Sequence, residues 1–368
     1  MNFSKIVGVL LLLFTASALL GQNATVMRMT GAKSAMVLLP DAADETPLAE
    51  GQEVPAGALI TVGEGTKLFL RTFQGAITTA DAGSVFMIEE VKANDDGTET
   101  TRIELRGGDI VANLDPTKKG IHDYRVRTPK GVAAARGTTY SVSVAGLQVV
   151  VTVSGGEVSF SIPLLPNPVV ITPGNASTGG SSVSLAAALA NPDTAEVVNK
   201  AMQATAAAVA TLVSDPTSGV TANTLTQVIN TAAAAGNSNG DGGSLVAVVA
   251  AAAAQANSNV ATQVVQAAVA ATASSSNAAA VANTVVASVT RAAASSSGQS
   301  VASVAATLSQ AANTASGGTV NVNTDTITNA VNNSNSAPQA PATETPTTNT
   351  PDVEVEVPVD NIVVSPTD

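Results

Sequence analysis

Residues able to do chemistry are scarce in this sequence. Its 368 residues include no cysteine, so disulfides, thiolate zinc sites and cysteine nucleophiles are excluded. The single histidine, His122, precedes Asp123. Acyl-transfer triads need a positioned imidazole, and one histidine cannot build a histidine-rich metal site. We predict that His122 is a solvated turn residue, and that the protein is a binding protein without enzymatic activity.

Oxygen ligands for a metal ion are also poorly represented. Asn237, Asn239 and Asp241 precede Gly242 as at the start of a calcium loop, but Val248 stands where a bidentate Glu is needed. We expect this segment to be a glycine-rich connector and not a calcium site. We therefore expect no catalytic residues, no cofactor and no metal. Two further acidic groups are predicted as hairpin and surface residues, the 94–97 turn (NDDG) and the Glu89-Glu90 pair.

The overall charge restricts the partners. A formal net charge of -12 leaves no cluster of Lys and Arg large enough to neutralise phosphates. We therefore expect no nucleic-acid partner.

The elements that must position these residues differ along the chain. Residues 25–163 show short strand-like runs with turn signals about every ten residues, which predicts one β domain with a thin sandwich core. Glycine pairs such as Gly107-Gly108 are predicted to close hairpins. The expected strands are 26–29, 35–39, 67–72, 76–79, 85–91, 100–105, 109–113, 124–128, 138–144, 148–153 and 157–161.

One motif within this domain combines several conformationally special residues. A strand should end at a proline, and a new strand should begin after a glycine that follows an arginine. The arginine, Arg136, is predicted to tie two strands together; the alternative is a contact to an anionic ligand. The motif residues are Val126, Thr128, Pro129, Arg136, Gly137, Thr138, Tyr140 and Val142.

This motif resembles the hallmark of the FecR domain, the periplasmic module named for the ferric-citrate regulator. The segments 47–72, 104–114 and 153–160 are similar to other parts of the family pattern, so the resemblance covers roughly residues 25–163. It implies a mainly β, jelly-roll-like sandwich that takes part in signalling. It supplies no catalytic or ligand residues.

The first 21 residues predict export. Lys5, an apolar run and the small residues Ala16, Ala18 and Gly21 form the pattern of a signal peptide cleaved before Gln22. The apolar run is shorter than the ~20 residues that cross a bilayer, although an uncleaved anchor is the alternative. We expect the periplasm or cell surface of a Gram-negative bacterium, with no transmembrane helix in the mature chain.

The rest of the chain is low in complexity. Residues 164–182 are predicted as a Pro/Gly/Ser-rich linker, with an edge strand as the alternative. Residues 183–316 are Ala/Val/Ser/Asn-rich, and Asn191-Pro192 and Asp215-Pro216 are predicted helix starts. Valines recurring about every twenty residues, at Val264-Val265, Val285-Val286 and Val304, predict stacked short helices. A disordered stalk is the alternative.

Residues 317–368 are predicted as a disordered Thr/Pro-rich tail. Its last part, the acidic and apolar segment 353–364, could also pair with a sheet edge, but a solvated tail is the preferred interpretation.

Two functions remain open. Founding FecR proteins receive a signal from an outer-membrane receptor and control a cytoplasmic sigma factor. Here only Met1 to Lys5 precede the apolar segment, so we expect no sigma-binding portion. The first hypothesis is an exported binding or signal-sensing module with a protein or cell-envelope partner. The alternative is a structural or adhesive surface protein that self-associates through the Ala/Val/Asn-rich region. The sequence does not define the oligomeric state.

Overall fold

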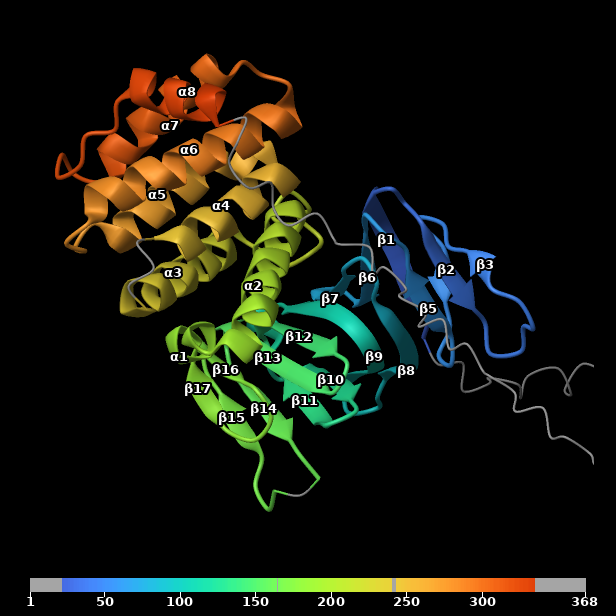
Figure 1. Cartoon of the computed structure of the whole chain (residues 1–368). Coiled ribbons are helices and arrows are strands. Elements are labelled where there is room, and N and C mark those ends of the chain that lie inside the picture. Colours follow the sequence, from blue (N-terminus) through green and yellow to red (C-terminus); the bar gives the residue numbers. More distant parts are fainter. Residues whose placement is uncertain (1–21, 164, 240–242, 335–368) are drawn as a thin grey trace, which may run out of the picture.

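The computed structural model describes residues 22–163, 165–239 and 243–334. A β-rich part spans residues 24–184, and a helical part follows it (Figure 1). The predicted fold class, a mainly β domain followed by helices, is confirmed. The predicted signal peptide and the segment 353–364 lie outside the described residues.

The strands form two layers that pack face to face. The helix-facing sheet has the strand order β4-β1-β6-β7-β9-β12-β13-β16-β17, all antiparallel. Its bounds are β1 Ala24–Gly31, β4 Glu53–Val54, β6 Thr66–Phe73, β7 Ala76–Ala80, β9 Glu99–Leu114, β12 Thr139–Ala145, β13 Gln148–Gly155, β16 Asn175–Ser177 and β17 Ser182–Ser184.

The outer sheet has the order β3-β2-β5-β8-β9-β10-β11-β14-β15, in which only the β9–β10 pair is parallel. Its other strands are β2 Ala35–Leu38, β3 Thr46–Pro47, β5 Leu59–Val62, β8 Val85–Ala93, β10 His122–Thr128, β11 Gly131–Ala135, β14 Val158–Ser161 and β15 Val169–Ile171.

Strand β9 belongs to both sheets. Its first half pairs with β8 and β10 in the outer sheet, and its second half pairs with β7 and β12 in the helix-facing sheet. The prediction of two strands joined by a hairpin at Gly107-Gly108 is therefore wrong. Gly108 has a φ of +85° and lies against the backbone of Ser84, so this glycine lets one strand change layers instead of reversing.

Alternating side chains separate the two faces of the helix-facing sheet. On β6, Leu68 and Leu70 point into the core between the sheets, whereas Phe69 points to the helices. The same core holds the largest buried side chains, Tyr124 and Tyr140, whose rings meet edge to face with centroids 6.5 Å apart. Burial raises the pKa of both phenols, and the Tyr124 hydroxyl is hydrogen-bonded to Thr78.

Several short strands were not predicted from the sequence, in segments whose composition is typical of connectors. The alanine run before Arg136 is β11, which pairs with β10 and β14. In the predicted linker, residues 164–182, β15 and β16 add to the two sheets and β17 begins at Ser182. The edge-strand alternative is therefore closer to the structure than a free linker, because these strands are short enough to fit between the prolines.

The helical part contains eight α-helices and one 3₁₀ turn among the described residues. Stacked helices, not a disordered stalk, form this region, and the recurring valines at 264–265, 285–286 and 304 are all buried in its core. The bounds are α1 Leu185–Ala190, α2 Pro192–Leu212, α3 Ala222–Asn239, α4 Ser244–Ala256, η3 Ser258–Val260, α5 Ala261–Thr272, α6 Ala278–Ser297, α7 Val301–Ala315 and α8 Thr324–Asn333.

The two predicted helix starts had different outcomes. Asn191 caps α2, because its side-chain oxygen accepts a hydrogen bond of 3.0 Å from the Asp193 N–H. Asp215 also accepts from a backbone N–H, that of Thr217 at 2.8 Å, but only a turn follows, and α3 begins at Ala222. Gly219, with a φ of +71°, lies in that turn. The prediction of a helix start at Asp215-Pro216 is therefore wrong.

The helical part extends further than predicted. The tail was expected from residue 317, but α8 packs its buried Ile327 and Val331 in the helical core. The remainder of the predicted tail, residues 335–368, lies outside the described residues. None of the described helices combines the length and apolar character that a membrane crossing requires.

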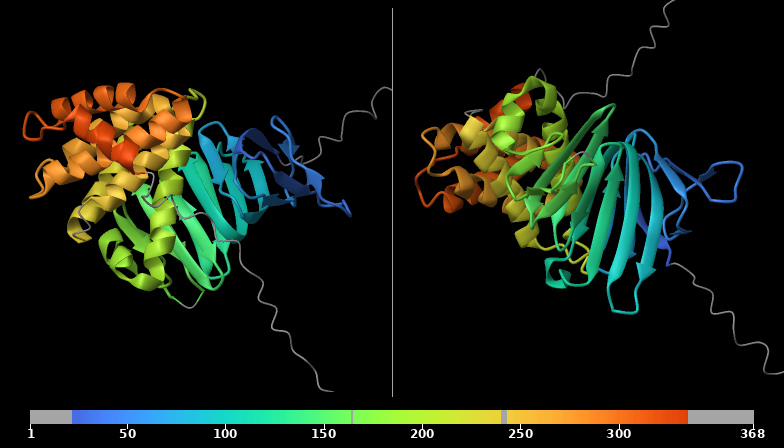
Figure 2. Two further views of the ribbon diagram at one scale, coloured as in Figure 1. Left: turned by 45° about the horizontal axis from the view of Figure 1, so that its top comes forward. Right: turned by 90° about the horizontal axis from the view of Figure 1, so that it is seen from below.

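Helices cover one face of the β-rich part (Figure 2). Helix α2 lies across β9, β12 and β13, where Ala204 and Ala208 pack on Val111. Val150 of β13 and Ala176 of β16 pack among the buried side chains of the helices and are part of the helical core. The small side chains of α2 allow this close approach, so the sheet forms a platform for the helices.

Candidate functional site

Most of the predicted motif residues are parts of the β framework. Val126 and Val142 are fully buried between the sheets beside Tyr140. Thr128 donates a hydrogen bond of 2.9 Å from its hydroxyl to the Gly131 carbonyl and closes the β10–β11 hairpin, with Pro129 exposed in the turn. These residues stabilise the fold, and a role of any of them as a partner contact stays a prediction.

The R-G-T segment joins β11 to β12. Thr138 donates from its hydroxyl to the Glu157 carbonyl at 3.1 Å, and Gly137 adopts a φ of +61° against Pro116 and Lys119. Arg136 is exposed, and within the described residues its guanidinium makes no hydrogen bond or ion pair. The prediction that Arg136 ties two strands together is therefore wrong, because its side chain leaves the sheet for solvent.

His122 is not a solvated turn residue; that prediction is wrong. It begins β10, where it pairs with Glu99 of β9, and its side chain is buried. Its Nδ1 lies 2.9 Å from Glu99 Oε2, but the two atoms are not aligned for a hydrogen bond. Burial lowers the pKa of His122 and outweighs the opposite effect of the Glu99 carboxylate.

A pH dependence of stability follows from this burial. The unfolded state takes up a proton near the ordinary pKa of ~6.5, while the folded state stays neutral to lower pH. We therefore expect the free energy of unfolding to fall as pH drops below ~6.5. The His122→Gln variant should lose less stability over this range. Urea unfolding at several pH values measures both; parallel curves for the two proteins would contradict the expectation.

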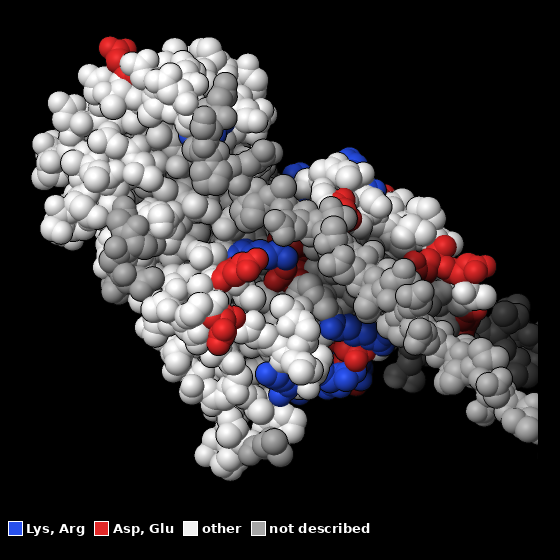
Figure 3. All heavy atoms as spheres, viewed as in Figure 1, with Lys and Arg blue, Asp and Glu red and all other residues white. Residues whose placement is uncertain are grey.

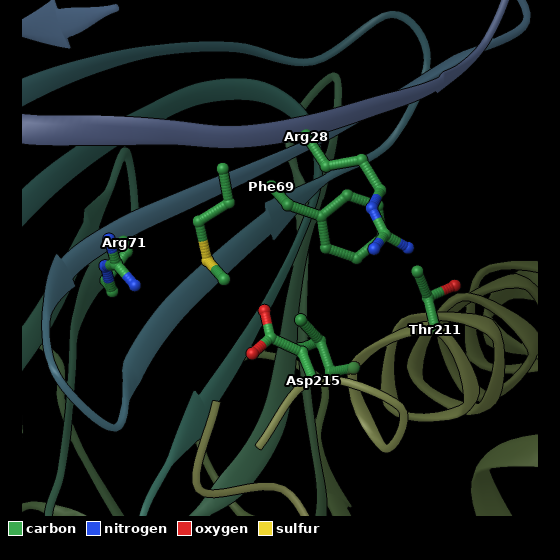
Figure 4. Close-up of a pocket in the computed structure, with 7 residues that line it drawn as sticks. Arg28, Phe69, Arg71, Thr211 and Asp215 are labelled. Carbon is green, nitrogen blue, oxygen red and sulfur yellow. The ribbon is translucent and has the colours of Figure 1, made fainter. Parts of the chain in front are cut away.

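A groove follows the line where α2 meets the edge of the helix-facing sheet. At one end lies a cavity of about 180 Å³ with a floor of Met27, Phe69 and Leu212. Arg28 and Arg71 reach it from the neighbouring strands β1 and β6 (Figure 4). Asp215 reaches it from the turn after α2, so this end carries both charge signs above an apolar floor.

The charges at this end are linked through a threonine. Asp215 accepts from the Thr217 hydroxyl at 2.7 Å, and that hydroxyl oxygen lies 3.4 Å from Arg71 Nη1. Burial alone would raise the pKa of Asp215, but the Thr217 hydrogen bonds and the nearby Arg71 and Arg28 lower it. Asp215 is therefore a carboxylate at neutral pH.

The other end of the groove is larger. A cavity of about 500 Å³ lies between α2, α4, the strands β1 and β6, and Asp81, which follows β7; it shares Thr211 with the first cavity. Lys200 Nζ lies 2.8 Å from Asp109 Oδ2, and Lys67 pairs with Asp81 beside it. Partial burial would lower the pKa of Lys200, but the Asp109 carboxylate outweighs this and raises it.

The groove crosses a sharp boundary in charge. Charged side chains concentrate over the β-rich part, whereas the helical part is nearly uncharged on the face that Figure 3 shows. In the described ranges, no group of three or more His, Asp and Glu is placed to hold a metal. Of the candidate calcium loop, Asn237 and Asn239 belong to α3, and Asp241 and Gly242 lie outside the described residues. The groove therefore presents charged groups of both signs beside apolar side chains.

None of the groove residues was singled out from the sequence as a site. Arg28 and Arg71 lie on strands that become neighbours only through the β1–β6 register. Asp215 gave the only available signal, since it is one of three charged residues between residues 201 and 324.

One family model matches part of the chain. Residues 56–159 match the family model described as FecR protein, within the range of the predicted resemblance. None of the curated proteins compared with the chain matches it.

Two crystal structures of a candidate anti-sigma factor from Parabacteroides distasonis match part of this chain. The first is 18% identical with a TM-score of 0.27, and the match covers 32% of this chain and 52% of that chain. The second is 16% identical with a TM-score of 0.29, and the match covers 36% of this chain and 64% of that chain. The match therefore spans less than two thirds of either chain.

Proposed function

From the FecR domain at residues 56–159, we propose that this protein is an exported, non-enzymatic module that senses or transmits a signal in the cell envelope by binding a protein or envelope component. The family match is the observation that carries the proposal. Export is part of the proposal and rests on the sequence of the first 21 residues.

We further propose that the partner binds in the groove between the β-rich part and α2. Arg28, Arg71 and Asp215 supply charges of both signs around an apolar floor, which suits a partner segment with a central apolar side chain and polar neighbours. Arg28 and Asp215 make no direct ion pair within the described part of the chain, so both can contact a partner.

A double variant, Arg28→Glu with Arg71→Glu, tests the groove. Reversing both charges beside Asp215 should repel an acidic group of the partner and weaken binding by about tenfold or more. Partner recovery from envelope extract on the immobilised full chain measures this, with mass spectrometry to compare the bound proteins and glycans.

The matched control is Arg102→Glu with Arg106→Glu. These arginines are also on strands and about half exposed, but they lie on the outer sheet, where they pair with Glu90 and Glu104. The control should keep the partner. If both double variants bind like the original protein, the groove is not the binding site.

No observation favours the structural or adhesive alternative. The valines and alanines of the helical part pack against one another in its core. Among its described residues, Val248 is the one large apolar side chain that is exposed to solvent. Few apolar side chains therefore remain there for self-association.

A further inference from the structure

A second cavity lies beside the R-G-T segment, away from the groove. Its volume is about 240 Å³, and its walls come from β9, the β11–β12 connection, the end of β13, and α3 with the turn before it. Lys119 is the single charged residue among those that line it, and the Asp115 carboxylate lies beside Gly219 at its edge. The Lys119 ammonium can therefore pair with an anionic group of a ligand.

Asn113 is the residue in this cavity that needs explanation. It lies on β9 between Ile77 of β7 and Thr139 of β12, on the face of the sheet turned to the helices. The residue is 1% exposed, and neither its Nδ2 nor its Oδ1 has a hydrogen-bond partner among the described residues. An amide buried without partners destabilises a protein, so its presence needs another reason.

The space beside Asn113 results from a glycine. Asn113, Thr139 and Gly155 are paired in one row across β9, β12 and β13. The last residue of this row, Gly155, has no side chain. A Cβ at Gly155 would lie 2.9 Å from Gln227 Oε1, the tip of a flexible and exposed side chain of α3. Above the strands, the cavity is therefore bounded by the exposed Gln227 side chain of α3.

We propose that this cavity binds a small carboxylic acid that also carries a primary carboxamide. The unpaired amide of Asn113 offers an N–H donor beside a carbonyl acceptor, and a primary carboxamide presents the complementary acceptor and donor at neutral pH. Lys119 at the exposed rim pairs with the carboxylate of the ligand. The volume is below the ~300 Å³ at which drug-sized sites begin, which fits a compact ligand.

Calorimetric titration of the full chain with glutaramate and succinamate tests the proposal. We expect at least one of the two to bind in the millimolar range or tighter. Levulinate, which has a ketone acceptor without the amide donor, should bind about tenfold more weakly than the better of the two. The absence of binding by both amides would overturn the proposal, and so would equal binding of levulinate.

Two variants locate the site. Asn113→Leu removes the amide, and Gly155→Val fills the cavity from β13 without touching Asn113; each should weaken binding of the amide by about tenfold or more. Equal binding by Asn113→Leu would overturn the proposal. Because Leu leaves no buried amide unpaired, this variant should unfold at a higher temperature than the original protein when no ligand is present.

The matched control is Ser143→Ala. Ser143 lies on the same face of the sheet and its buried hydroxyl also lacks a partner, but it does not line the cavity. This variant should also unfold at a higher temperature while binding the amide unchanged. Loss of binding in Ser143→Ala would show that the effect is not specific to Asn113. The groove variants Arg28→Glu and Arg71→Glu should bind the amide ligand as the original protein does. A failure of the ligand proposal can therefore be distinguished from a failure of the proposed function.

Discussion

Replacing Gly108 by alanine is expected to destabilise the protein by about 2–4 kcal/mol. The backbone at this residue has a φ of +85°, where a side chain is strained, and a Cβ would lie 2.5 Å from Ser84 Cα. This is the point where β9 leaves the outer sheet for the helix-facing sheet, so neither layer can move away without breaking its pairing with β9. The midpoint and slope of urea unfolding measure the loss.

The neighbouring glycine provides the control. A Cβ at Gly107 meets nothing within 4 Å, and its φ is not in the left-handed region. Gly107→Ala should therefore change stability by no more than about 1 kcal/mol, in either direction. Equal losses for the two variants would show that β9 is not constrained at Gly108 as described.

The second large effect is expected in the helical core. Val265 on α5 is fully buried, and Val265→Asp would place a carboxylate among valines and alanines without a partner. The expected loss is roughly 3–5 kcal/mol, enough to unfold most of the helical part. Far-ultraviolet circular dichroism during urea unfolding measures it.

Gln266→Asp is the matched control, because it puts the same residue one position further along α5 on the exposed surface. Its effect should stay within ~0.5 kcal/mol, apart from a small difference in helix propensity. If Val265→Asp were as harmless as Gln266→Asp, the helical part would not be a packed core in solution.

The sequence predicted those parts of the fold that local patterns determine. The alternation of Leu68 and Leu70 with Phe69 marks a strand with two different faces, and the cap at Asn191 marks the start of α2. The recurring valines of the helical part identify its buried face. Each of these signals lies within a few residues of the element that it defines.

Features that depend on distant pairing were missed. Gly107-Gly108 has the composition of a hairpin turn, and only the register with β7, β8, β10 and β12 shows that β9 continues. His122 has the sequence context of a loop residue, and only the parallel pairing of β10 with β9 shows that it begins a strand. Composition alone could not place Arg136 in solvent, because its predicted partners depended on which strands lay beside it.

The candidate sites were harder still to predict. Arg28, Arg71 and Asp215 are separated by up to 187 positions in the sequence, and the packing of α2 on the sheet brings them together. Asn113 is an ordinary strand residue in the sequence. Its lack of partners follows from its neighbours Ile77 and Thr139 across the sheet, which no local pattern reveals.

The contribution of Val150 and Ala176 to the helical core has a consequence for biogenesis. Both residues come earlier in the chain than any of the α-helices, and they pack in the helical core from the side of the sheet. When the polypeptide is made or exported from its amino terminus, this surface is ready before the first helix emerges. The nearly uncharged alanine-rich segment can then dock on the sheet as it emerges. This shortens the time during which its apolar helix faces are exposed to water.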